Sequence, residues 1–178
     1  MKHDNSSDKM QMSSKGVTII IACRNKEVCI KPLFELLQAQ INPSIDEIVF
    51  VDDGSIDNTE ELVNFWIKDN AIKIIYHYQK NQGMHGAHNT AYKLIDTELN
   101  VCIDSDDFMP DDAIEKILCN WLKIKDKKEF AGLVGLDATK KGEIIGTKIP
   151  KNITQTTMYD MYYKHGVIGD KKYLKMII

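Results

Sequence analysis

The sequence predicts an α/β protein built on a largely parallel β-sheet. Short runs rich in β-branched residues alternate with amphipathic segments over the first 125 residues, which is the pattern of consecutive βαβ units. Two of these runs end in acidic residues, and ligands of open parallel sheets bind beyond such strand ends. We therefore expect one domain over residues 17–178, with a mostly parallel, twisted sheet flanked by helices.

The composition limits the class of protein. Of the 178 residues, 43% are hydrophobic and 28% are charged, so the chain can bury one sizeable core. The net charge of −3 gives no basic field, which argues against a nucleic-acid partner. No window holds 18 consecutive apolar residues, and Met1–Lys15 lacks the apolar core of a signal peptide. We therefore predict a cytoplasmic protein without a transmembrane segment.

The N-terminal arm and the cysteines carry no sign of a site. Residues 1–16 are polar and lack periodicity, which predicts a disordered arm. The cysteines lack CxxC spacing, and we expect them to be reduced, buried and apolar in character: Cys23, Cys29, Cys102 and Cys119.

The first predicted strand is Val17–Ala22, which is β-branched at nearly every position and suited to burial on both faces. Apolar residues at helical spacing then predict a helix over residues 30–40. Asn42-Pro43 breaks that helix, and Glu47–Val51 forms the second strand.

Asp57 and Glu60 resemble a capping arrangement that opens the second helix. Ile72–His77 is the third predicted strand, and a glycine-containing loop, Asn81–Asn89, leads into helical residues Ala91–Ile95. The apolar face predicted for the second helix comprises Leu62, Val63, Phe65, Trp66 and Ile67.

The fourth strand is the apolar run Leu99–Ile103, followed by a helix over residues 111–125 with Trp121 in the core. Phe130–Leu136 is predicted as a fifth strand, leading through a hairpin-like turn, 137–142, into residues 143–146. The last predicted element is a short helix over residues 156–164, which Gly166 ends.

Acidic residues gather at the ends of the second and fourth strands. Asp52 and Asp53 follow the second strand, and Asp104, Asp106 and Asp107 follow the fourth. Two carboxylates about 5 Å apart repel by roughly 3 kcal/mol at an effective dielectric near 20, so such a cluster calls for a counter-charge. Mg²⁺ or Mn²⁺ bound together with substrate phosphates would supply it. The alternative is that these residues only form turns and cap helices.

Other nucleotide-binding signatures are missing from the sequence. There is no GxGxxG after the first strand and no GxxxxGK[ST], which disfavours a dinucleotide-binding domain and a P-loop NTPase. His85 and His88 lie beside glycines, where histidines more often donate to phosphate than bind a metal.

Four segments together resemble family 2 glycosyltransferases of the GT-A type. They match that family's opening strand and loop, its second-strand motif, its Asn/Gly loop and its DxD motif: Val17–Asn25, Val51–Thr59, Asn81–Asn89 and Ile103–Asp107 with Pro110. The sequence departs from the family at Ala22 and Arg24, where Pro or Thr and Tyr are frequent, and at His88, where Arg is common. The resemblance implies a GT-A domain over residues 17–178 with a Rossmann-like nucleotide-binding half.

The resemblance also implies an activity, namely transfer of a sugar from a UDP-linked donor to an acceptor hydroxyl with inversion at the anomeric carbon. It implies that Asp106, with Asp104 or Asp107, binds Mn²⁺ or Mg²⁺, and that Asp53 accepts a hydrogen bond from uracil. The implied nucleotide-binding residues are Ala22, Arg24, Asn25, Asp53, Asn81, Gly83, His88 and Asp104.

The acceptor implied by the resemblance is a glycan or a lipid-linked sugar in polysaccharide synthesis, reached at the inner face of the membrane by peripheral association. No QxxRW motif is present, which disfavours a processive membrane synthase. No Glu-Asp pair follows the DxD motif, and Asp170 is the only late candidate for the general base. We therefore expect a domain that is incomplete at its C-terminus and weakly active.

Two other functions remain open at this point. A nucleotidyltransferase would need a glycine-rich, basic phosphate loop near the first strand, where only Arg24 and Lys26 are present. A non-catalytic module that binds nucleotide sugars would keep the acidic strand ends without the base.

Overall fold

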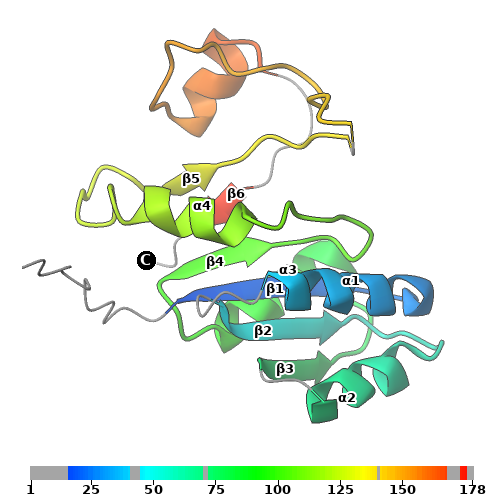
Figure 1. Ribbon diagram of the computed structural model, residues 1–178. Coiled ribbons are helices and arrows are strands. Elements are labelled where there is room, and N and C mark those ends of the chain that lie inside the picture. The colour runs from blue at the N-terminus through cyan, green and yellow to red at the C-terminus, as the bar shows by residue number, and fades with distance from the viewer. Residues whose placement is uncertain (1–15, 41–44, 70–71, 140, 168–172, 176–178) are drawn as a thin grey trace, which may run out of the picture.

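The computed structural model describes residues 16–40, 45–69, 72–139, 141–167 and 173–175. Four strands form one parallel sheet in the order β3-β2-β1-β4 (Figure 1). These strands are β1 (Val17–Cys23), β2 (Ile45–Asp52), β3 (Lys73–Tyr78) and β4 (Leu99–Cys102). The predicted α/β class with a parallel sheet is confirmed.

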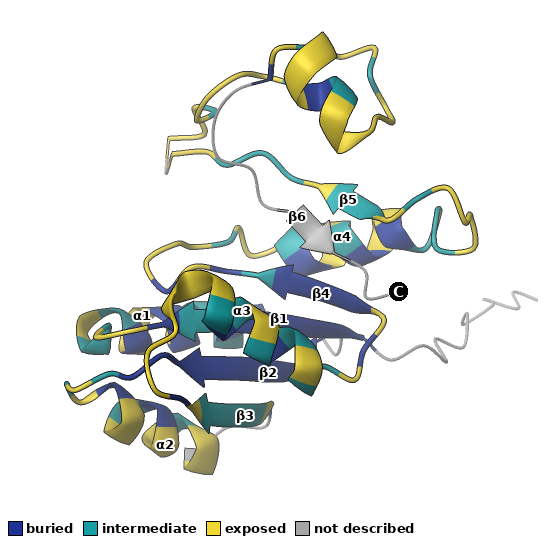
Figure 2. Ribbon diagram, turned by 180° about the vertical axis from the view of Figure 1, so that it is seen from behind, coloured by how far each residue is buried: buried dark blue, intermediate teal, exposed yellow. Residues whose placement is uncertain are grey.

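Helices follow the strands along the chain, as βαβ connections require. They are α1 (Glu27–Ala39), α2 (Thr59–Asp69), α3 (Gly83–Leu94) and α4 (Ala113–Trp121). The apolar residues of α1, α2 and α4 join one core on one face of the sheet, whereas α3 packs on the opposite face (Figures 1 and 2). The sheet is therefore the middle layer of three.

The position of β1 inside the sheet explains why its sequence is apolar at every position except Thr18. It pairs with β2 on one side and with β4 on the other, and alternate residues face opposite layers. Ile19 and Ile21 join the core under α1, whereas Ile20 packs with Ala87 and Ala91 of α3. The small alanines allow α3 to approach the sheet closely.

Two helices begin earlier than the sequence predicts. Helix α1 begins at Glu27 because the Glu27 backbone N–H donates to Oδ2 of Asp57, 3.1 Å away, which satisfies one group of its first turn. Helix α3 begins at Gly83, so most of the segment predicted as a loop is helical. Asn81 Oδ1 accepts a hydrogen bond from the Gly83 N–H at 2.9 Å just before this helix.

Burial differs from prediction at several positions. In α2, Phe65 is 60% exposed and Ile67 is 36% exposed, because the residues that this helix contributes to the core are Leu62, Val63 and Trp66. Cys119 is exposed on α4 rather than buried, and Cys29 is half-buried. Cys23 is buried as expected, and burial raises the pKa of its thiol to about 12. The predicted core position of Trp121 is confirmed.

The predicted fifth strand does not extend the parallel sheet. Strand β5 (Gly132–Val134) instead pairs antiparallel with β6 (Tyr173–Lys175) in a separate two-stranded sheet. An antiparallel bridge between Ala138 and Ile144 confirms the hairpin-like turn. The predicted C-terminal helix is a short helical segment that includes a π-helical turn, Asp160–Lys164. Gly166, which was predicted to end this helix, has a φ of +60°, a left-handed conformation typical of a residue that ends a helix.

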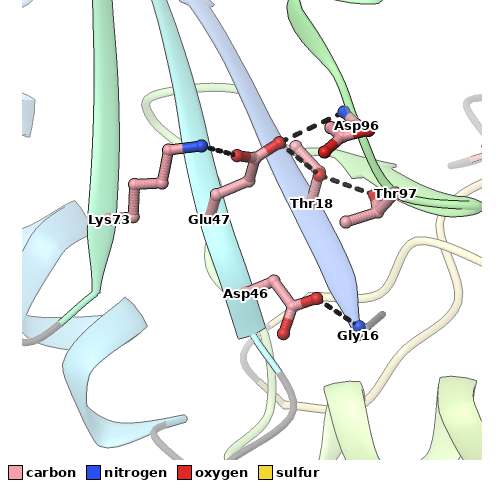
Figure 3. Close-up of polar contacts among 7 residues, drawn as sticks. All are labelled: Gly16, Thr18, Asp46, Glu47, Lys73, Asp96 and Thr97. Carbon is pink, nitrogen blue, oxygen red and sulfur yellow. Dashed lines mark hydrogen bonds and ion pairs between the residues drawn. The ribbon is translucent and has the colours of Figure 1, made fainter. Parts of the chain in front are cut away.

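A polar network lies near the N-terminal ends of the parallel strands (Figure 3). Glu47 of β2 is buried, and its carboxylate accepts hydrogen bonds from Thr18 Oγ1 at 3.1 Å and Lys73 Nζ at 2.7 Å. The Asp96 backbone N–H lies 3.4 Å from Oε1 of the same carboxylate. These contacts join β1, β2, β3 and the segment before β4. The acidic residues of the candidate site lie at the opposite, C-terminal ends of the strands.

Candidate functional site

The candidate site lies where the parallel strands end. Strands β1 and β4 are neighbours, but the chain leaves β1 toward β2 and reaches β4 only after β3. Strand order therefore reverses between β1 and β4, which is the position where ligands of such sheets bind. The segments that follow β1, β2 and β4 meet at this edge (Figure 1).

The loop after β1 is held to the loop after β2 by side chain–backbone hydrogen bonds. The Asn25 N–H donates to Ser55 Oγ at 2.8 Å, and the Ile56 N–H donates to Asn25 Oδ1 at 2.9 Å. Arg24 Nε donates to the Gly54 carbonyl oxygen at 3.3 Å. Asn25 has a φ of +53°, a left-handed conformation that Asn tolerates better than most residues.

The Asp57 side chain connects the first turn of α1 to the first turn of α2. Its Oδ1 accepts hydrogen bonds from the Thr59 N–H at 3.1 Å and from Thr59 Oγ1 at 2.6 Å, and its Oδ2 accepts from the Glu27 N–H. Although burial acts in the opposite direction, hydrogen bonds from Thr59 and Glu27 lower the pKa of Asp57 below its ordinary value. The predicted capping role of Asp57 is confirmed, and it extends to the first turn of α1.

Asp52 acts within the local structure. Its Oδ1 accepts a hydrogen bond from the Ser55 N–H at 2.7 Å, and its Oδ2 accepts one from the Tyr76 hydroxyl at 3.0 Å. Burial, followed by this hydrogen bond, raises the pKa of Tyr76 well above its ordinary value. Of the two acids at the end of β2, Asp52 therefore has the turn-forming role that the sequence left open.

Asp53 is only 5% exposed and is oriented by two donors. Its Oδ1 accepts hydrogen bonds from Gln79 Nε2 at 2.7 Å and from the Gln82 N–H at 2.8 Å. Gln79 is itself held by Thr90 Oγ1, which donates to Gln79 Oε1 at 2.6 Å. These contacts fix the carboxylate and join the end of β2 to the segment that opens α3.

The acids after β4 lie on an exposed turn. The Ile103 N–H donates to the Ile20 carbonyl oxygen at 2.9 Å, which continues the pairing with β1 up to the first aspartate. The Asp107 N–H donates to the Asp104 carbonyl oxygen at 3.0 Å, so a turn brings these residues together. Ser105 is buried, whereas Asp104, Asp106 and Asp107 are exposed.

Lys26 pairs with Asp106 across the site. The distance from Lys26 Nζ to Asp106 Oδ2 is 2.8 Å, and the side chains are 36% and 58% exposed. The hydrogen bond and the charge of Asp106 raise the pKa of Lys26. Lys26 was not among the residues predicted for the site, although its position in the loop after the first predicted strand was a signal.

The carboxylates fit a metal that also takes ligands from phosphate. Asp104, Asp106 and Asp107 offer the hard oxygen atoms that Mg²⁺ and Mn²⁺ prefer. Within the described ranges, no three His, Cys, Asp or Glu side chains are gathered as a metal site. The three predicted metal-binding residues, Asp104, Asp106 and Asp107, are therefore not gathered into a metal site by this measure.

The remaining predicted residues lie around this edge or outside the described residues. Ala22 is half-buried near the end of β1, Asn81 is exposed, and Gly83 is the first residue of α3. His88 is half-buried in α3, with its ring centroid 6.4 Å from that of Tyr92. His85 is exposed in the same helix. The predicted base, Asp170, and the predicted helix break, Asn42-Pro43, lie outside the described residues.

Comparison with known proteins decides the family. The model of glycosyl transferase family 2 matches residues 18–127, which include every strand-end acid discussed above. The chain belongs to glycosyl transferase family 2. The family membership predicted from the sequence is thereby confirmed.

Two curated relatives are similar to this chain over only part of their own length. The putative glycosyltransferase EpsH of Bacillus subtilis (strain 168) is 33% identical over 108 residues, covering 60% of this chain and 30% of that protein. The poly-β-1,6-N-acetyl-D-glucosamine synthase of Staphylococcus aureus (strain COL) is 32% identical over 99 residues, covering 56% of this chain and 24% of that protein. The match spans less than a third of either relative.

Solved structures agree with the GT-A fold. S. aureus TarS 1–349, in complex with UDP-GlcNAc, has a TM-score of 0.56 and 25% identity, covering 61% of this chain and 31% of that one. The mannosyltransferase PcManGT from Pyrobaculum calidifontis, in complex with GDP-Man and Mn²⁺, has a TM-score of 0.57. It is 23% identical, covers 67% of this chain and 35% of that one, and supports the fold alone. No helix among the described residues is long and apolar enough to cross a membrane.

Proposed function

We propose that the chain is the donor-binding part of an inverting, metal-dependent glycosyltransferase that uses a UDP-linked sugar. The main support for this proposal is that two groups of acidic residues, one buried and one exposed, lie where the parallel strands end. Asp53 is buried and oriented by the protein, whereas Asp104, Asp106 and Asp107 are exposed on a turn. An oriented carboxylate suits recognition of a base, and exposed carboxylates suit a metal that brings a diphosphate.

Each part of the donor has a candidate partner among these residues. Asp53 accepts the uracil N–H, and the loop Ala22–Asn25 flanks the base. The segment Asn81–His88 lies toward the ribose and phosphates, with Asp104. The similarity to TarS, whose solved complexes contain UDP and UDP-GlcNAc, supports UDP as the nucleotide.

Asp106, with Asp104 or Asp107, holds Mn²⁺ or Mg²⁺ in this proposal. The metal supplies a Lewis acid that stabilises the negative charge left on the diphosphate. The protein residues orient the donor and hold the metal, and a carboxylate takes the proton from the acceptor hydroxyl. Asp170 remains the candidate for that carboxylate. The relative named for poly-β-1,6-N-acetyl-D-glucosamine synthesis supports a glycan acceptor, either free or lipid-linked.

The proposal is tested by calorimetric titration with UDP in the presence of Mn²⁺ and in the presence of chelator. We expect Mn²⁺ to tighten UDP binding by about tenfold or more, equivalent to roughly 1.4 kcal/mol. Asp106→Ala should remove most of this gain without a change in melting temperature, because the side chain is exposed. Asp126→Ala, which changes another exposed acid, is the matched control. Equal UDP affinity with metal and with chelator would contradict metal-dependent donor binding.

Turnover requires a separate experiment. Release of UDP from UDP-sugars in the presence of Mn²⁺ would support glycosyl transfer. Release of pyrophosphate from UTP and a sugar phosphate would indicate a nucleotidyltransferase instead. Because Asp170 is the candidate base, Asp170→Asn should lower any turnover by about 10²- to 10⁴-fold while UDP affinity stays the same.

A further inference from the structure

An ion pair joins the loop after β1 to the turn after β4. Lys26 and Asp106 are 80 positions apart in sequence, yet Lys26 Nζ lies 2.8 Å from Asp106 Oδ2. The two strands that precede these residues are neighbours in the sheet, with β1 pairing along β4. The two side chains therefore meet above the boundary between β1 and β4.

That boundary is the place where strand order reverses, and a ligand of an open parallel sheet enters the crevice there. We call the Lys26–Asp106 contact the crevice ion pair. In the proposed function Asp106 holds the metal, and the metal binds the donor diphosphate. The diphosphate would therefore lie beside the Asp106 carboxylate. A divalent cation and the Lys26 ammonium then compete for Asp106 Oδ2, because that one oxygen cannot keep the ammonium at 2.8 Å and take the cation in the same position.

The backbone groups around Lys26 already have other partners. The Lys26 N–H donates to Thr59 Oγ1 at 3.2 Å, and the Glu27 N–H donates to Asp57 Oδ2 at 3.1 Å. The start of α1 is thus held against the loop after β2 independently of the lysine side chain. The ammonium group can change partner while its backbone stays fixed.

The exchange is favourable on electrostatic grounds. An exposed ion pair contributes little to stability because water solvates both charges, so opening it costs little. A divalent cation gives Asp106 a partner of twice the charge, and the anionic oxygens of a diphosphate give Lys26 a charge-assisted hydrogen bond. Both members of the pair therefore gain from donor binding.

We infer that the crevice ion pair is exchanged on donor binding, so that Asp106 passes to the metal and the Lys26 ammonium passes to the donor diphosphate. This inference rests on the proposed function and deepens it. It assigns Lys26 as a diphosphate-binding residue, and it explains why a lysine stands beside a carboxylate that the metal requires. In the absence of donor, Lys26 neutralises that carboxylate.

A double-mutant cycle in the presence of chelator tests the exchange. UDP affinity is measured for the unchanged chain, Lys26→Met, Asp106→Ala and the double variant. Without metal, Asp106→Ala should release Lys26 and tighten UDP binding by about fivefold. The same substitution in the Lys26→Met background should give no gain, because no ammonium is left to release. Equal gains in both backgrounds would indicate general charge repulsion by Asp106, and no gain in either would also overturn the exchange.

A second measurement, with Mn²⁺ present, tests the diphosphate contact. Lys26→Met should weaken UDP by about tenfold and leave uridine, which has no diphosphate, unchanged. Lys116→Met is the matched control, since Lys116 Nζ lies 2.6 Å from Asp112 in another exposed ion pair. A loss of uridine affinity in Lys26→Met would show that the lysine only shapes the loop and would overturn the inference.

The two proposals fail in different ways. If the unchanged chain binds UDP with Mn²⁺ but the cycle shows no coupling, the exchange is wrong and the donor-binding function stands. If the unchanged chain binds no UDP with Mn²⁺, the proposed function fails and the exchange fails with it.

Discussion

Asp53 shows how one carboxylate can be fixed on one side and remain available on the other. Oδ1 accepts hydrogen bonds from Gln79 and Gln82, while no described residue donates to Oδ2. Because the first oxygen is held, the second has a fixed direction. An acceptor that is oriented before the ligand arrives discriminates strongly, since a base without the matching N–H leaves it unpaired.

The substitution Asp53→Asn separates the structural role of Oδ1 from the proposed ligand-binding role of Oδ2. The variant can keep an oxygen acceptor toward Gln79 and Gln82 but presents an NH₂ donor where the proposed function has the carboxylate accept the uracil N–H. We expect UDP affinity to fall by about tenfold or more, with inorganic diphosphate affinity and melting temperature nearly unchanged. Calorimetry and a thermal melt measure these quantities. An equal loss for UDP and diphosphate would assign Asp53 to the metal or the fold. Asp53→Ala is the comparison in which stability should fall as well.

At the scale of single elements, the four parallel strands were predictable. A strand that is buried on both faces leaves a continuous apolar run in the sequence, and this signal needs no knowledge of neighbours. Val17–Ala22 was predicted as a strand, and β1 ends only one residue later. The start of α3 was not predictable in this way, because Gly83, Gly86 and Asn89 lower helix propensity. Packing of Ala87 and Ala91 on the sheet outweighs that propensity.

In the candidate site, too, the features set by local sequence pattern were predictable and those set by contacts between distant segments were not. Strand alternation was enough to bring Asp53 and Asp106 to one edge, because parallel strands must end together. Sequence could not separate Asp52 from Asp53, because their roles depend on Tyr76 and Gln79, which reach them from β3 and the segment after it. Nor could it find the partner of Lys26, because a contact across 80 positions leaves no local pattern.

The packing of α1 against α2 rests on Phe34. This side chain is 1% exposed, and its ring centroid lies 5.3 Å from that of Trp66 and 6.1 Å from that of Phe50. We expect Phe34→Ala to lower the free energy of unfolding by about 3–5 kcal/mol, because it removes a buried aromatic side chain and leaves a cavity. Urea unfolding followed by tryptophan fluorescence measures the change.

Phe65→Ala is the matched control for that experiment. Phe65 also contacts the Trp66 ring, at a centroid distance of 6.4 Å, but is 60% exposed. Its removal should cost less than about 1 kcal/mol. Comparable losses from the two variants would mean that the Phe34 stack does not hold the helices together.

For the molecule as a whole, the two edges of the sheet have different charge arrangements. Where the strands end, exposed aspartates lie beside the buried carboxylates of Asp52 and Asp53, and where the strands begin, the buried carboxylate of Glu47 is paired with a lysine (Figure 3). Lys73 is the cation of this second edge, and its hydrogen bond and ion pair with Glu47 raise its pKa above 10.5. Glu47 and Lys73 are thus paired where the strands begin, and in our inference the Lys26–Asp106 pair where the strands end is exchanged on donor binding.

The raised pKa of Lys73 gives stability a defined dependence on pH. A folded-state pKa above the unfolded value of 10.5 means that folding favours the protonated lysine. The contribution is therefore complete below pH 10.5 and disappears as the pH rises through the folded-state pKa. We expect the unfolding free energy of the unchanged chain to fall in this alkaline range more steeply than that of Lys73→Met. Parallel pH slopes in urea unfolding would contradict the linkage.

The small antiparallel sheet has a consequence for the order in which backbone amides exchange with solvent. Strands β5 and β6 pair through three residues each, and β6 comes long after β5 in the chain. Short strands that close a long loop gain few hydrogen bonds for the chain entropy lost, so they open in local fluctuations that leave the parallel sheet intact. In deuterated buffer, amides of β5 should therefore exchange well before those of β1, whose hydrogen bonds should be broken only when the whole domain unfolds.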